Sequence, residues 1–189
     1  MADEQLTSKE NIRRLVDGEM PLEMIHELVR MPSKDEDRFW KYLEVLQEKV
    51  GWPEKILARI SDHLYVVSKD GGERVVKCDC GQELGDYRVN WKLNALVHCR
   101  RTPEQFQEVF SVVGPDPDYV EVREYYCPGC QAQLGVEVVP IGYPPLFEVL
   151  PDIDAVHELG GSPLPDADPE WFEDRTAAQT QAWVRKEEA

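Results

Sequence analysis

The sequence has no long apolar run and no apolar leader. No stretch of its 189 residues approaches the ~20 consecutive apolar residues that span a bilayer. The first ten residues, MADEQLTSKE, are polar, whereas a secretory signal needs an apolar segment there. We therefore expect a cytoplasmic protein with no membrane partner, in a compartment that keeps cysteines reduced.

Basic side chains are scarce. Lys and Arg number 21 against 37 Asp and Glu, which gives a formal net charge of −16. A free-standing nucleic-acid binder needs positive charge to neutralise phosphates, so this composition argues against a nucleic-acid partner. Half of the acidic excess lies in residues 144–189, which carry 11 acidic and 3 basic side chains.

Recognisable catalytic motifs are also missing. The sequence contains no glycine-rich phosphate loop, no G-x-S-x-G and no H-E-x-x-H. Carboxylate pairs such as Asp152 and Asp154 fit a solvated acidic segment better than an acid–base pair. We therefore expect no catalytic residue in this chain, and the residues favour a binding or structural subunit.

Two cysteine pairs carry the strongest chemical signal. They are the C-x-C of Cys78 and Cys80 and the C-P-G-C of Cys127 and Cys130, each after a strand-like segment. Four thiolates complete the tetrahedral shell of Zn²⁺ and leave no position for water, so the expected role is structural. The pattern predicts a zinc ribbon whose two turns are separated by a 46-residue insert.

Alternatives to this zinc site remain open at the sequence level. Iron in a rubredoxin-like site is a rival, although such sites generally use two C-x-x-C loops. A dithiol redox centre is another, but it leaves the second pair unexplained. The fifth cysteine, Cys99, follows His98, and either residue could replace one of the four ligands. We favour a buried segment over residues 97–99, with Cys99 as a small apolar side chain.

Residues 1–60 have helical periodicity. Apolar stripes predict helices around residues 12–16, 22–29 and 39–50, and a further short helix from Pro53 to Ile60. Capping-box spacing occurs at Thr7 and Glu10 and again at Ser33 and Glu36. Trp40 and Tyr42 lie off the main stripe, where they pack either against the protein's own core or against a partner.

From residue 61 the apolar period changes to two. Residues 64–67 and 74–76, joined by a Gly-Gly turn, predict a hairpin, and residues 119–126 and 134–139 predict further strands. Between them, Thr102, Pro103 and Gln105 form a strong helix start. The pattern therefore predicts a zinc-ribbon-like antiparallel β domain with a helical insert over residues 61–143.

Half of the 14 prolines fall in residues 140–189. Proline disfavours long helices and central strands, so residues 144–189 are expected to form an extended, acidic C-terminal arm. Large apolar side chains along it either bind another surface, which should then be basic, or wrap over the chain's own domain. The expected fold class is α+β.

Several separate motifs, in order, resemble the small (gamma) subunit of acetone carboxylase and the related acetophenone carboxylases. The resemblance covers residues 8 to 165 and rests on the runs IRRLVDG (12–18), DRF (37–39), YLEVLQE (42–48), CDCG (78–81), NWKL (90–93), VH (97–98), REYYCPGC (123–130), YP (143–144) and PDI (151–153).

The resemblance implies a role in ATP-dependent carboxylation of a ketone, such as acetone with bicarbonate to acetoacetate. It places ATP and the catalytic metal on two larger subunits of a hetero-oligomer, a heterohexamer, with a structural Zn²⁺ in this chain. The family often has a further cysteine shortly after the C-x-C-G run, whereas this sequence has Gly85 in that neighbourhood. This departure leaves Cys78, Cys80, Cys127 and Cys130 as the expected ligands. The alternatives are a zinc-ribbon module for protein interaction or the transcription and RNA machinery, and a small iron electron carrier.

Overall fold

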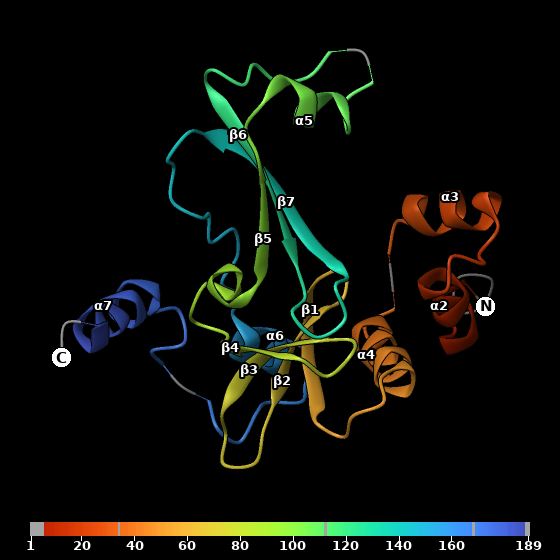
Figure 1. The fold of residues 1–189 in the computed structure, drawn as a ribbon. Coiled ribbons are helices and arrows are strands. Elements are labelled where there is room, and N and C mark those ends of the chain that lie inside the picture. The colour runs from red at the N-terminus through yellow and green to blue at the C-terminus, as the bar shows by residue number, and fades with distance from the viewer. Residues whose placement is uncertain (1–5, 34, 112, 168, 188–189) are drawn as a thin grey trace.

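The computed structural model describes residues 6–33, 35–111, 113–167 and 169–187. It is an α+β structure with a four-stranded and a three-stranded antiparallel sheet and helices around them (Figure 1). None of the described helices is both long and apolar enough to cross a membrane.

The predicted N-terminal helices are confirmed, but both predicted capping boxes are wrong. The helices are α2 (Lys9–Val16), α3 (Leu22–Arg30) and α4 (Arg38–Lys49). Ser8, not Thr7, caps α2, because its hydroxyl accepts a hydrogen bond from the Asn11 N–H at 3.3 Å. The Thr7 hydroxyl instead donates to Asp35. Helix α4 begins after Asp37, with no side-chain cap.

The predicted helix from Pro53 to Ile60 is wrong, because this segment forms strand β1 (Lys55–Ser61). Periodicity alone cannot separate a helix from a strand over so few residues, and pairing with the next strand decides the outcome here. The Gln47 side chain holds the junction: its amide donates to Glu54 O at 3.1 Å and its carbonyl accepts from the Ile56 N–H at 2.9 Å.

The four-stranded sheet has the order β1-β2-β3-β4. Its other strands are β2 (Leu64–Ser68), β3 (Arg74–Cys78) and β4 (Glu83–Asp86), and β2 and β3 form the predicted hairpin. Alternate residues feed two apolar clusters. Leu64 and Val66 join one that includes Trp91 and Ile153, while Tyr65 and Val67 join a second with Leu43 and Leu46 of α4. The sheet is therefore covered on both faces.

The three-stranded sheet projects from this body (Figure 1). It consists of β5 (Leu96–Arg100), β6 (Val120–Tyr126) and β7 (Gln133–Pro140), with β6 in the centre. A 3₁₀ helix, η1 (Trp91–Asn94), precedes it, and α5 (Pro103–Gln107) follows β5. The predicted start of α5 is confirmed, with a complete capping box between Thr102 and Gln105.

The C-terminal segment is not extended throughout, because it contains α6 (Ile153–Leu159) and α7 (Thr176–Glu187). Asp152 caps α6 by accepting a hydrogen bond from the Ala155 N–H at 2.8 Å. Ile153 is buried in the core, and Trp171 packs against the same cluster. This part of the segment therefore wraps over the chain's own domain, while Phe172 stays 66% exposed.

Trp40 takes part in this wrapping. Its indole N–H donates to Gly160 O at 2.9 Å, and its ring meets the buried His157 ring edge-on at a centroid distance of 4.9 Å. Tyr42 accepts a hydrogen bond from Arg59 at 2.9 Å. Both residues that lie off the helical stripe thus contact the protein's own residues.

Candidate metal centre

The first cysteine turn follows β3. Cys78 is the last residue of that strand, and its carbonyl accepts a hydrogen bond from the Gly81 N–H at 2.8 Å. Its own N–H donates to Gln82 O at 2.9 Å, which closes the loop around Cys80. Gly81 has φ +94°, a conformation that side chains other than hydrogen rarely allow. The backbone therefore turns back at once and aims both sulfurs at the same side.

The second turn follows β6 and is similar but one residue longer. The Cys127 carbonyl accepts from the Gln131 N–H, and the Cys127 N–H donates to Ala132 O, both at 2.9 Å. Gly129 lies where the two turns approach each other: a Cβ there would be 3.3 Å from Cys80 Sγ and 3.1 Å from Gln82 Cβ. Glycine at this position allows the two turns to come together.

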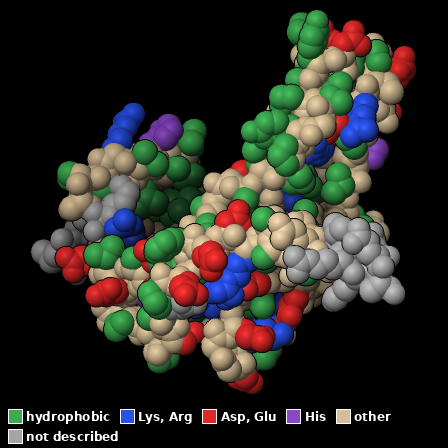
Figure 2. Space-filling view, turned by 90° about the vertical axis from the view of Figure 1, so that its left-hand side faces the viewer, with side chains coloured by type: hydrophobic (Ala, Val, Ile, Leu, Met, Phe, Trp, Pro, Cys, Tyr) green, Lys and Arg blue, Asp and Glu red, His purple; other side chains and the backbone are tan. Residues whose placement is uncertain are grey.

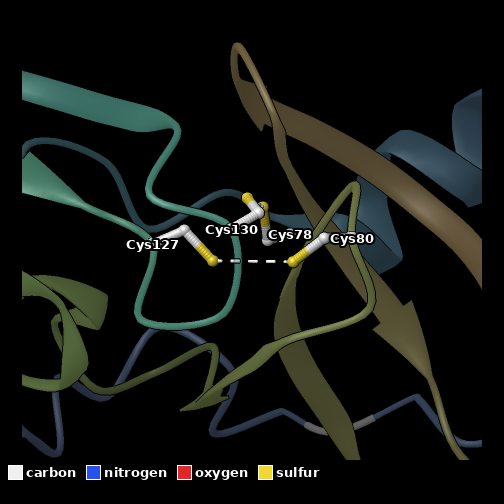
Figure 3. A group of neighbouring side chains, drawn as sticks. All are labelled: Cys78, Cys80, Cys127 and Cys130. Atoms are coloured by element: carbon white, nitrogen blue, oxygen red, sulfur yellow. Dashed lines mark hydrogen bonds between the residues drawn. The ribbon is translucent and has the colours of Figure 1, made fainter.

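All four predicted cysteines meet between the turns (Figure 3), with their sulfurs within 4.8 Å of one another. Cys78 Sγ lies 3.8 Å from Cys130 Sγ, and Cys80 Sγ lies 3.6 Å from Cys127 Sγ. Four sulfurs placed tetrahedrally around Zn²⁺ at about 2.3 Å are about 3.8 Å apart. The geometry therefore fits a tetrahedral ion bound by both turns, and all four cysteines are free of disulfides.

The two cysteines nearest the strands, Cys78 and Cys127, are fully buried, and Cys80 and Cys130 are exposed. Burial raises the pKa of the Cys78 thiol and of the Cys80 thiol. Burial also acts on Cys127, but hydrogen bonds from the backbone N–H groups of Cys130 and Gly129, together with those of the Cys78 and Cys80 thiols, outweigh it and lower the pKa of the Cys127 thiol. Such N–H groups stabilise a thiolate, the form that binds metal.

Asp79, between the first two cysteines, is held by residues that the sequence pattern does not indicate, because they come from distant segments. The Trp52 indole N–H donates to Asp79 O at 3.1 Å, and the Asp79 carboxylate pairs with the His63 ring. His63 itself has φ +66° in the β1–β2 turn. These contacts tie the first cysteine turn to the four-stranded sheet and orient it.

Cys99 and His98 lie on β5 and are not members of the four-sulfur group. The Cys99 thiol donates to Glu121 Oε2 at 3.5 Å. The expectation that residues 97–99 form a buried segment is wrong: Val97 is 52% exposed and His98 is exposed, because β5 is an edge strand of the projecting sheet.

Comparison with known proteins places this cysteine site in a family. The sequence model described as acetone carboxylase gamma subunit matches residues 50–159, which include both cysteine turns. The chain belongs to this family. It is 35% identical over 162 residues to the acetone carboxylase gamma subunit of Xanthobacter autotrophicus, covering 84% of this chain and 96% of that protein. The family resemblance inferred from the motifs is thereby confirmed.

A second relative is the acetophenone carboxylase beta subunit of Aromatoleum aromaticum. It is 36% identical over 81 residues, which cover 41% of this chain and 63% of that protein. Both relatives are named as subunits of carboxylases, and their names concern different ketones.

Proposed function

We propose that this chain is a structural, zinc-binding subunit of a multi-subunit, ATP-dependent ketone carboxylase. In this proposal the complex joins a ketone such as acetone to bicarbonate, with acetoacetate as the product. The nucleotide sites and the catalytic metal lie on two larger subunits, and the chain itself supplies no catalytic residue. The family match over both cysteine turns supports the assignment to such a complex.

The four-sulfur geometry carries the metal part of the proposal. Cys78, Cys80, Cys127 and Cys130 bind one Zn²⁺, and the sulfur separations of 3.6 and 3.8 Å support this ligand set. Four protein ligands leave no coordination position for a reacting molecule, so the ion joins the two sheets as in a zinc ribbon. The ion thus stabilises the junction at which the three-stranded sheet leaves the body.

We further propose a division into a helical segment (1–60), a zinc-ribbon β domain (61–143) and a C-terminal arm with an acidic tail (144–189). Strand β1, at the end of the first segment, extends the sheet of the second. The proposed assembly is a cytoplasmic heterohexamer with the two larger subunits. The acidic excess of the arm supports contact with comparatively basic partner surfaces.

Purification of the chain alone and together with the larger subunits from its own organism tests the proposed function. We expect about one zinc per isolated chain, no ATP hydrolysis by that chain, and ketone-dependent ATP hydrolysis by the complex. ATP hydrolysis by the isolated chain would contradict the structural role. Failure of the chain to copurify with a carboxylase would contradict the assignment to the complex.

A further inference from the structure

One face of the three-stranded sheet buries three charged side chains. Pairing places Glu121, Arg123 and Glu137 on one face, where their exposed fractions are 0, 8 and 4%. On that face the Trp91 ring packs edge-on against Tyr125 at a centroid distance of 5.9 Å. Backbone groups of the segment after β7 also take part, because the Leu146 N–H donates to Glu137 at 3.0 Å. We call this side of the sheet the covered face.

The opposite side presents apolar side chains to solvent. Leu96 of β5 and Val136 and Val138 of β7 are 51, 50 and 52% exposed. In the register of the sheet they share a face with Tyr126 and His98, and with the largely buried ion pair of Arg100 and Glu124. We call Leu96, His98, Tyr126, Val136 and Val138 the open face. Figure 2 shows hydrophobic side chains among charged ones on the projecting part of the molecule.

This distribution reverses the usual polarity of a half-exposed sheet. In β7 the charged Glu137 is buried between Val136 and Val138, which are exposed. A sheet with one face in water ordinarily turns its polar residues outward and its valines inward. The β5 side of the open face also borders a hollow of about 460 Å³. Exposed apolar side chains beside a hollow are typical of a surface that binds another macromolecule.

Charge indicates which macromolecule fits. A second copy of this chain would bring together two molecules of net charge −16. At the far end of the projecting sheet, the exposed side chains of Glu104, Asp116 and Asp118 add local negative charge. A matching surface therefore needs an apolar centre and Lys or Arg around it, which a different chain can offer.

We propose that the open face docks on a non-identical carboxylase subunit whose matching surface is apolar and bordered by basic residues. The inference rests on the proposed function, because it requires a larger partner subunit. It specifies which side of the three-stranded sheet is buried in the complex. The covered face holds the sheet's own shape, and the open face makes the intersubunit contact.

Two single substitutions of equal exposure test the docking surface. Val138→Lys places a charge in the open face, and Ile141→Lys places the same charge after the end of β7, where Ile141 is also 52% exposed. Both full-length variants are coexpressed with the larger subunits, and the affinity of the purified chains is measured. Zinc content and melting temperature of each free variant show that both fold.

We expect Val138→Lys to bind the larger subunits about tenfold more weakly or worse, because a lysine would be buried in an apolar contact. Ile141→Lys is expected to bind like the unmodified chain. Unchanged affinity of Val138→Lys would overturn the inference while leaving the proposed function intact. A homodimer of the unmodified chain that Val138→Lys dissociates would overturn it in favour of a second copy. If the unmodified chain binds no larger subunit, the proposed function fails and the inference fails with it.

Discussion

Replacement of Lys92 by Met removes one partner of a buried ion pair. Lys92 and Glu137 are paired between η1 and β7, and both side chains are only 1% exposed. Without the ammonium group, Glu137 keeps the Tyr125 hydroxyl at 2.9 Å, the Leu146 N–H at 3.0 Å and the Arg123 guanidinium at 3.6 Å, but its charge has lost its closest cation. Breaking a buried pair from one side costs about 3–5 kcal/mol.

The assays are urea unfolding and thermal unfolding, both followed by fluorescence, with Lys69→Met as the control. Lys69 pairs with Glu83 at the surface, where both side chains are more than 30% exposed, so its loss should cost under ~1 kcal/mol. At about 3 kcal/mol, Lys92→Met should lower the melting temperature by roughly 6–12 °C. If Lys92→Met lowers the free energy of unfolding by no more than Lys69→Met does, the reasoning is refuted.

The penalty should also depend on pH. Burial acts to raise the pKa of Glu137, but hydrogen bonds from Lys92 and Tyr125 outweigh it, so the folded-state pKa is lowered. The stability that this group supplies is therefore present above its unfolded-state pKa, about 4.3, and is lost as pH falls through the lowered folded-state value. In Lys92→Met the pKa of Glu137 rises. Acidification should therefore reduce the difference in unfolding free energy between the variant and the unmodified chain. A difference that widens from pH 7 to pH 5 would contradict this sign.

Two further substitutions probe the metal turns and the C-terminal segment. Gly129→Ala should weaken zinc binding about tenfold in a chelator competition, because its methyl group would crowd Cys80, whereas Gly51→Ala, with open space around it, should not. Arg74→Met removes a 2.6 Å ion pair with Asp154 from a 5% exposed side chain, so amide exchange in α6 should accelerate about tenfold. Unchanged exchange in α6 would show that the pair does not hold the segment.

Local signals in the sequence predicted much of the fold. The stripe of α4, the β2–β3 hairpin and the Thr102 capping box depend on neighbouring residues, and the structure confirms them. Strand β1 could not be predicted in the same way, because a short apolar segment acquires its conformation from pairing with β2. The prolines of this segment favour an extended arm, and helix α6 forms there because Asp152, which follows Pro151, caps its first turn.

The candidate site also has a part that the sequence predicts and a part that it does not. The four cysteines were predictable from their spacing, since each pair lies within one turn and tetrahedral coordination needs two such turns. Their supporting contacts were not, because Trp52 and His63 reach Asp79 from separate parts of the chain. The inverted polarity of the three-stranded sheet was equally hidden: its alternation of Val and Glu is visible in β7, but only packing shows which face is covered.

X-ray absorption spectroscopy of the purified full-length chain tests the central claim most directly. Zinc held by Cys78, Cys80, Cys127 and Cys130 should give an absorption edge for zinc and a single shell of four sulfurs at about 2.3 Å. Cys127→Ser should lose the metal, and Cys99→Ser should retain the unaltered spectrum. An iron edge, a shell that includes nitrogen or oxygen, or loss of the zinc in Cys99→Ser would contradict the proposed ligand set.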